Sequence, residues 1–173
     1  MKQSIDAFEY AGHICTALKK GILLTTALSG KVNTMTIGWG KIGIEWARPV
    51  FIAYVRESRY TKSILEETGE FTVNIPYGEY DPKILGYCGT ISGRDHDKIS
   101  DMGLTLVEPN VISVPGIKEF PLTLECKVIY KQKQDTALPT ALLERFYPEE
   151  AEGFRDYHTA YYGEIVDAYL ITE

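Results

Sequence analysis

LTLECKVIY, at residues 122–130, is typical of a β-strand, because it is rich in β-branched and aromatic residues and its polarity alternates along part of its length. Four further stretches are also rich in β-branched and aromatic residues: ILLTTAL (22–28), PVFIAYV (49–55), FTVNI (71–75) and GEIVDAYLI (163–171). Turn-forming residues separate them along the chain. So many short strands predict a mainly β protein, built as an antiparallel barrel or sandwich.

Helices are expected to be few and short. Three segments have helical features: TKSILEETG (61–69), YDPKILGYCG (80–89) and TALLERFYPEEAEGF (140–154). The first ends in a glycine suited to a helix C-terminus, and the second begins with Asp81 as a cap and Pro82 at the first helical position. The third predicts a helix that is broken near Pro148. We therefore expect a β-barrel with a few short helices on its outside.

The composition is that of a folded globular protein. The 173 residues are 45% hydrophobic and 24% charged, and they predict a single domain over residues 1–173. A net charge of -6 offers no basic face for duplex nucleic acid. The longest apolar run, GILLTTAL, is far shorter than the ~20 residues that span a bilayer. MKQSIDAFEY lacks the apolar stretch of a signal peptide, so we expect no membrane attachment and a cytoplasmic protein.

Cysteines and histidines give no sign of a disulfide framework or a metal site. Cys15, Cys88 and Cys126 are odd in number and widely separated, which favours reduced thiols in a core. The three histidines, His13, His96 and His158, also lie far apart in the sequence, so we predict no metal.

The familiar phosphate-binding and hydrolase motifs, GxGxxG, GxxxxGK[ST], HExxH and GxSxG, are absent from the sequence. Four local clusters of polar and aromatic residues remain as candidate sites. They are KVNTMTIGWGKIG (31–43), VRESRYTKS (55–63), CGTISGRDHDK (88–98) and YHTAYYGEI (157–165).

In the first cluster, two glycines flank Trp39 and polar residues interrupt a strand-like run. Small residues there would let a second backbone or a flat ligand approach closely. A twisted strand with glycine bulges and a partly exposed tryptophan explains the same residues.

In the second cluster, Arg56 and Arg59 offer planar cationic donors, and Ser58, Thr61 and Ser63 offer hydroxyls. With the free N–H groups of a helix start, these side chains are suited to one phosphate. The alternative is a helix capped by Ser58 or Thr61, with solvated arginines.

In the third cluster, Ser92 and Asp95 resemble a capping box, which would place Lys98 about one turn into a short helix. The charged residues would then pair on a solvated face, where each pair contributes ~0–1 kcal/mol. Glycines before a charged helix start are also suited to binding an anion.

The fourth cluster is a tyrosine-rich strand with His158 near its start. Its aromatic rings and imidazole could border a flat heteroaromatic ligand. Ordinary cross-strand aromatic packing explains them equally well.

Taken together and in this order, the four clusters resemble the flavin reductase-like family. The matching residues are NTMTIGWG, RESRYTKS followed by GEFTVNI, CGTISGRDHDK and HTAYYGEIVDAYL, so the resemblance covers roughly residues 15 to 171. Members of this family bind FMN in a split β-barrel and include flavoredoxin. The resemblance implies an FMN-binding split barrel, a homodimer with one FMN per subunit at or near the interface, and NADH, NADPH or a redox protein as electron donor.

The resemblance also implies a set of FMN-binding residues. Asn33, Thr34, Met35 and Thr36 would follow the ring or ribityl chain, with Trp39 close by. The phosphate and ribityl contacts would come from Arg56, Ser58, Arg59, Tyr60, Thr61 and Ser63. Ser92, Gly93 and Lys98 would point toward the cofactor, and His158 would reach the edge of the ring. Lys98 would favour the anionic reduced ring or the phosphate, while Asp95 and Asp97 hold the loop.

The function implied is an FMN-dependent NAD(P)H oxidoreductase that reduces free flavin or another small acceptor. The flavin itself carries the chemistry, so no catalytic residue is required, although His158 could act as one. One alternative is an electron carrier of the flavoredoxin kind that a protein partner reduces. A third hypothesis is a cofactor-free binding domain on the same barrel.

Overall fold

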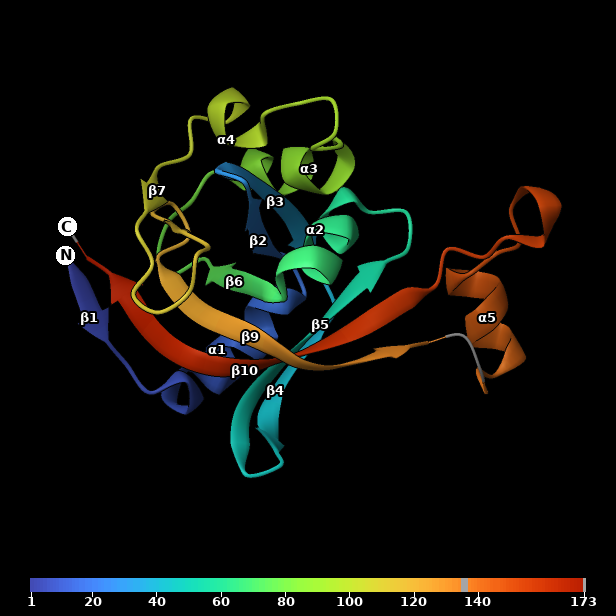
Figure 1. Ribbon diagram of the computed structural model, residues 1–173, viewed down its shortest axis with the longest axis horizontal. Coiled ribbons are helices and arrows are strands. Elements are labelled where there is room, and N and C mark those ends of the chain that lie inside the picture. The colour runs from blue at the N-terminus through green and yellow to red at the C-terminus, as the bar shows by residue number, and fades with distance from the viewer. Residues whose placement is uncertain (135–136, 173) are drawn as a thin grey trace.

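The computed structural model describes residues 1–134 and 137–172 (Figure 1). An antiparallel sheet runs in the order β3-β2-β6-β9-β10-β5-β4, and the short β1 pairs with β10. Its strands are β1 Lys2–Ser4, β2 Ile22–Leu28, β3 Lys31–Ile37, β4 Gly40–Glu45, β5 Arg48–Arg56, β6 Glu70–Ile75, β9 Leu122–Lys133 and β10 His158–Ile171. A separate pair joins β7 Leu106–Val107 to β8 Gly116–Ile117. The predicted mainly β fold is confirmed.

The two ends of the sheet order, β3 and β4, are consecutive in the chain and are joined only by Gly38 and Trp39. Such a link spans at most about 11 Å, so the sheet must curl until its outer strands meet as a barrel. Gly40 lets the start of β4 pack closely against the core, because a Cβ atom there would lie 2.7 Å from Cζ of Phe51 in β5. We call the meeting of β3 and β4 the seam.

All three predicted helices are present. The helical elements are η1 Ala7–Tyr10, α1 Ala11–Leu18, α2 Tyr60–Thr68, α3 Pro82–Thr90, α4 Lys98–Asp101, α5 Thr140–Phe146 and η2 Ala151–Gly153. Asp81 caps α3 by accepting from the N–H of Lys83, and Gly69 ends α2 in the left-handed conformation. The break near Pro148 separates α5 from η2. Figure 1 shows α2, α3 and α4 grouped on one side of the barrel, with α5 standing apart from it.

The sequence reading missed α1, although a helical spacing was present. Ile14, Ala17 and Leu18 recur at three- and four-residue intervals and are all buried in the barrel core. The side chain of Asp6 accepts the N–H of Phe8 and so starts the preceding turn. Helix α1 lies across the barrel from α2 and α3 (Figure 1).

Gly163 is a packing point of the barrel core. It lies in the middle of β10, opposite Phe51 of β5 and Val128 of β9. A Cβ atom at this position would lie 2.4 Å from Cζ of Phe71 and 2.8 Å from Cβ of Cys126. The absence of a side chain at Gly163 is therefore what lets the Phe71 ring pack against the β10 backbone.

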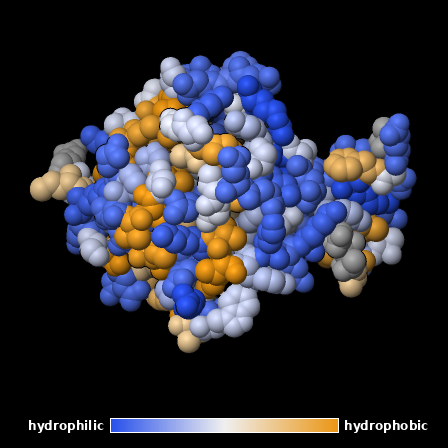
Figure 2. Space-filling view, viewed as in Figure 1, coloured by the Kyte–Doolittle hydropathy of each residue, from blue (hydrophilic) through white to orange (hydrophobic). Residues whose placement is uncertain are grey.

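Hydrophobic residues also lie on the surface, and Figure 2 shows several of them in the middle of the face where Figure 1 places β9 and β10. Another group, the hairpin patch, consists of Ile44, Trp46, Tyr130 and Tyr162. Ile44 is 65% exposed and Trp46 is 58% exposed. The Trp46 and Tyr130 rings are 5.6 Å apart, and those of Tyr130 and Tyr162 are 5.0 Å apart.

Within residues 1–134 and 137–172, no helix is long and apolar enough to cross a bilayer. The same residues contain no group of three or more histidines, cysteines and carboxylates arranged to hold a metal ion.

Candidate functional site

Two adjoining pockets lie beside the seam. The seam pocket has a volume of about 180 Å³ and is lined by Met35, Thr36, Ile37, Gly38, Trp39, Tyr54, Arg56, Arg59 and His158. The basic pocket has about 160 Å³ and is lined by Asn33, Met35, Ser58, Arg59, Tyr60, Thr61, Thr90, Ile91, Ser92, Gly93, Arg94 and Lys98. Met35 and Arg59 line both, so the two pockets lie side by side and share a wall. Together they fall within the range of about 300–1,000 Å³ that is typical of ligand sites.

Lys98 is the most unusual side chain of the basic pocket. It is only 4% exposed, and its Nζ donates to the carbonyl oxygen of Cys88 at 3.1 Å. Among the described residues this is its one hydrogen-bond acceptor, whereas an ammonium group carries three donors. Burial lowers the pKa of Lys98, and the neighbouring Arg59 lowers it further against the opposing effect of Cys88. A bound anion would supply acceptors for the remaining donors of Lys98.

The rest of the basic pocket has the same sign of charge. Of the described residues that line it, Arg59, Arg94 and Lys98 carry positive charge and none carries negative charge. Helix α2 begins here with no side-chain cap, so its first N–H groups are free to bind an anion. The alternative of a helix capped by Ser58 or Thr61 is therefore wrong. The Ser58 hydroxyl donates to Asp156 instead, and the Thr61 hydroxyl accepts from Asn33.

The loop before α4 is held close to β3. A Cβ atom on Gly93 would lie 1.9 Å from Oδ1 of Asn33, so only glycine fits there. The predicted capping box is wrong: the Ser92 hydroxyl accepts from the N–H of Arg94, which closes a local turn. Asp97 caps α4 instead, and Lys98 is the first residue of that helix rather than one turn inside it.

Cys88 is a buried and unreactive thiol. Burial raises its pKa to about 11, and the nearby Lys98 only partly opposes this effect. A protonated thiol is a weak nucleophile, so Cys88 contributes bulk to the core below α3.

His158 and Trp39 form the aromatic side of the seam pocket. Their ring centroids are 4.6 Å apart, and Nδ1 of His158 lies 2.7 Å from the Tyr147 hydroxyl. Burial lowers the pKa of His158 to about 4, with a further contribution from the cationic Arg56. The imidazole is therefore neutral at pH 7 and can exchange hydrogen bonds without carrying charge.

The neutral state of His158 makes the folded protein sensitive to mild acid. Its pKa is depressed from 6.5 to about 4 in the folded state, so the unfolded chain binds more protons between those values. This contribution to stability is complete above pH 6.5 and is lost as the pH falls toward 4. We expect the free energy of unfolding, measured with urea, to fall by about 1–2 kcal/mol between pH 7 and pH 5.

The variant His158→Asn removes this titration and should flatten the stability profile between pH 7 and pH 5. His96→Asn is the matched control, because it removes a histidine that lies on the exposed surface and not in the seam pocket. An equal slope in the protein and in His158→Asn would contradict the assignment.

Arg56 holds the chain segment that follows α5. Its two guanidinium nitrogens donate to the carbonyls of Phe146 and Asp156, at 3.0 Å and 2.8 Å. Arg56 therefore lines the seam pocket while it anchors this segment, and Arg59 is the less engaged of the two arginines.

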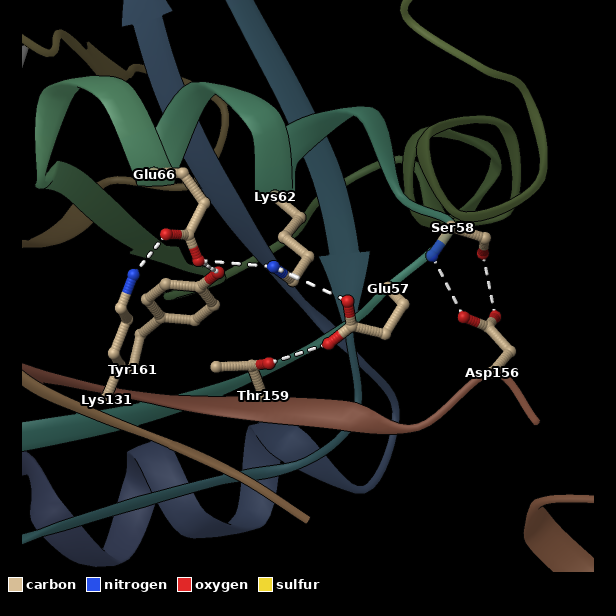
Figure 3. A network of polar contacts seen from close by, with 8 residues as sticks. All are labelled: Glu57, Ser58, Lys62, Glu66, Lys131, Asp156, Thr159 and Tyr161. Atoms are coloured by element: carbon tan, nitrogen blue, oxygen red, sulfur yellow. Dashed lines mark hydrogen bonds and ion pairs between the residues drawn. The ribbon is translucent and has the colours of Figure 1, made fainter. Parts of the chain in front are cut away.

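A network of polar side chains ties α2 to the barrel (Figure 3). Glu66 accepts from the Tyr161 hydroxyl at 2.7 Å and pairs with Lys62 and Lys131. Burial opposes its ionisation, but these three hydrogen bonds outweigh burial and lower the pKa of Glu66 to about 2. Asp156 accepts from both the N–H and the hydroxyl of Ser58, which fixes the approach to α2. The network sets where the uncapped helix start lies.

Removing one contact of this network tests its contribution. We expect Tyr161→Phe to lower the free energy of unfolding by about 1 kcal/mol, because the ionised Glu66 loses a donor. Tyr162→Phe, the next residue of the same strand, should change it by less than about 0.5 kcal/mol. Equal effects in urea unfolding would show that the Glu66 contact contributes nothing.

The structure gathers most of the residues named from the sequence. Thirteen of the fifteen line the seam or basic pocket, and two do not. Thr34 is buried and bonded to Thr25, and Ser63 lies on the exposed side of α2, where its hydroxyl donates to the Tyr60 carbonyl. Tyr54, Arg94, Tyr147 and Asp156 were missed as part of the site or its support. Of these four residues, only Arg94 lies inside one of the sequence clusters, where it is a charged residue of the third cluster.

Comparison with known proteins gives related chains. A flavin reductase like domain matches residues 16–173. An uncharacterized protein of Archaeoglobus fulgidus is 37% identical over 99 residues, which are 57% of this chain and 55% of that protein. The alignment thus spans about half the length of that relative.

Solved structures share the fold. Flavoredoxin of Desulfovibrio vulgaris superposes with a TM-score of 0.67 at 25% identity, over 87% of this chain and 68% of that one. An FMN-binding domain of a flavin reductase-like enzyme from Shewanella baltica gives 0.64 at 15% identity, over 98% and 77%, which shows the fold alone. With the domain match covering nearly the whole sequence, the chain belongs to the flavin reductase-like family.

Proposed function

We propose that the chain binds FMN in the joined seam and basic pockets and acts as a flavin-dependent oxidoreductase. The observation that carries this proposal is Lys98, a buried ammonium with one carbonyl partner in a pocket that has two further cations. A phosphate would supply the missing acceptors and would also accept from the uncapped start of α2. The family and the FMN-binding domain from Shewanella support flavin as the ligand.

The residues divide the binding between the two pockets. Lys98, Arg59 and Arg94 would hold the phosphate in the basic pocket. Trp39 and Met35 offer apolar surface for a flat ring in the seam pocket, and the neutral His158 offers a hydrogen bond at its edge. FMN, when bound, supplies the redox chemistry by accepting a hydride and passing electrons on. The chain binds, orients and shields it.

The first test is the visible absorption spectrum of the purified protein, recorded before and after FMN is added and the excess removed. A retained two-band spectrum of oxidised flavin, released on denaturation, is expected. A colourless protein that does not retain FMN would contradict the proposal and leave the cofactor-free binding domain.

We infer that the electron donor is NADH or NADPH and that the acceptor is free flavin or another small molecule. The second candidate is an electron carrier reduced by a protein, which the similarity to flavoredoxin favours. Mixing the FMN-loaded protein with each nicotinamide in the absence of oxygen separates the two. Rapid bleaching of the flavin supports the reductase, and a slow or absent reaction supports the carrier.

We also propose that the chain forms a homodimer through the hairpin patch. Trp46 and Ala47 form the turn between β4 and β5, with φ angles of 50° and 57°. This left-handed backbone conformation is energetically unfavourable for residues other than glycine. That cost and the exposure of Ile44 and Trp46 both favour a partner for this patch. Light scattering should give twice 19.5 kDa, and Ile44→Ser with Trp46→Ser should give 19.5 kDa. A monomeric starting protein would contradict it.

A further inference from the structure

A third and larger hollow, the apolar cleft, adjoins the seam pocket. It has a volume of about 530 Å³ and runs between the end of α1, the seam and α5. Gly38, Trp39 and Tyr54 line both the cleft and the seam pocket. A molecule in the cleft would therefore lie next to whatever fills the seam pocket, and Trp39 would border both.

The walls of the cleft are mostly aromatic and aliphatic. Phe146 meets Trp39 edge to face, with ring centroids 5.3 Å apart and planes at 80°. Trp39 is 39% exposed and Leu142 is 45% exposed, so both present apolar surface to the opening. Leu18 at the end of α1 closes the opposite wall. Flat rings bind well to such a surface because stacking and edge contacts add to the burial of apolar area.

The charge around the cleft is of one sign. Lys19 and Lys41 line it, and none of the described residues that line it is acidic. The Lys41 amine lies 5.8 Å from the centre of the Tyr54 ring. A hydrogen bond with Tyr54 raises the pKa of Lys41, so the amine stays positively charged at neutral pH. Two ammonium groups on an apolar cleft complement one negative group on an otherwise flat ligand.

We propose that the apolar cleft binds the reaction partner of the flavin, and that this partner is a flat aromatic molecule carrying an anionic group such as a carboxylate, sulfonate or phosphate. The part that concerns reaction with flavin rests on the proposed function. The binding of an anionic aromatic molecule rests only on the cleft, and it can be measured without FMN.

Two dyes of the same ring system provide the test. The probes are 8-anilinonaphthalene-1-sulfonate, which is anionic, and N-phenyl-1-naphthylamine, which lacks the sulfonate. In a Trp46→Phe background Trp39 is the sole tryptophan, so loss of its fluorescence reports a dye in the cleft or in the adjoining seam pocket, and the lysine variants decide between them. We expect both dyes to bind, and Lys19→Ala with Lys41→Ala to weaken the anionic dye about 10-fold while the neutral dye changes less than about 2-fold.

Controls separate the cleft from other surfaces. Lys20→Ala with Lys83→Ala removes two charges that do not line the cleft and should change neither dye. Leu142→Glu should weaken both dyes, with the anionic dye more affected. One equivalent of FMN should leave the anionic dye bound, because that flavin belongs to the neighbouring pockets.

Each of four results would overturn one claim, either a part of this inference or the proposed function on which its flavin part rests. An unchanged affinity of the anionic dye in the double lysine variant would refute the anionic class. Displacement of the dye by one equivalent of FMN would place the dye in the flavin site. A dimer that excludes both dyes, and that Leu142→Glu dissociates in light scattering, would show that a second copy covers the cleft. A protein that binds the dyes as expected but not FMN would refute the proposed function and leave the anionic site standing.

Discussion

Replacing Lys98 with methionine is expected to weaken FMN binding about 100-fold while leaving the FMN-free protein at least as stable as before. Methionine keeps the length of the side chain and removes the buried charge. Without an anion, that charge has one carbonyl acceptor and is costly to bury, so its loss should raise the free energy of unfolding by about 1 kcal/mol. With FMN present, the same loss removes a charged partner of the phosphate, which costs about 2–5 kcal/mol.

The opposite signs of the two effects make this test specific. FMN affinity is measured by the quenching of flavin fluorescence, and stability by urea unfolding without FMN. Lys98→Arg keeps the charge and should recover part of the affinity, while Lys83→Met, on the exposed side of α3, is the matched control. Unchanged FMN affinity in Lys98→Met would remove Lys98 from the site, and a less stable FMN-free protein would mean that its ammonium is already satisfied.

Gly163→Ala is expected to destabilise the fold strongly. The new Cβ atom would meet Cζ of Phe71 at 2.4 Å and Cβ of Cys126 at 2.8 Å, both within the barrel core. Neither neighbour is the free end of a flexible chain, so the ring and the strand must move together. We expect the free energy of unfolding to fall by about 3 kcal/mol or more, since overpacking a dense core typically costs 1–3 kcal/mol.

A second substitution tests the cause of this loss. Phe71→Leu makes room for the new methyl group, so Gly163→Ala with Phe71→Leu should be less destabilised than the sum of the single variants. Gly43→Ala in β4 is the control, because a Cβ atom there meets nothing within 4 Å. Simple additivity in urea unfolding would mean that the Phe71 contact is not the cause.

The strands were the most predictable part of the fold, because runs of β-branched and aromatic residues mark them locally. Alternation did not report burial along 122–126, where Thr123 and Glu125 are fully buried and the N–H groups of residues 110–112 donate to Glu125. Helix α1 could have been found from the spacing of Ile14, Ala17 and Leu18. The α4 start was misjudged because Ser92, Asp95 and Asp97 all cap helices well, and only tertiary contact decides among them. Gly93 must approach Asn33, which turns the chain and leaves Asp97 at the helix start.

The site residues that lie in the four sequence clusters could be predicted. Those that come from other segments of the chain could not. Asp156 and Tyr147 belong to the segment after α5, and nothing in that stretch of sequence marks them as partners of Ser58 and His158. The pairing arises because β10 runs beside β5. The preference of the Ser58 hydroxyl for Asp156 over the α2 start could not be known without that pairing.

The contact between Gly93 and Asn33 also limits the order in which this site can change over evolutionary time. Any side chain at position 93 collides with Oδ1 of Asn33, so a lineage must first shorten residue 33 before it can give up the glycine. Shortening residue 33 in turn removes the hydrogen bond from Asn33 to Thr61 at the start of α2. Substitutions at positions 33, 61 and 93 are thus expected to arrive as a set.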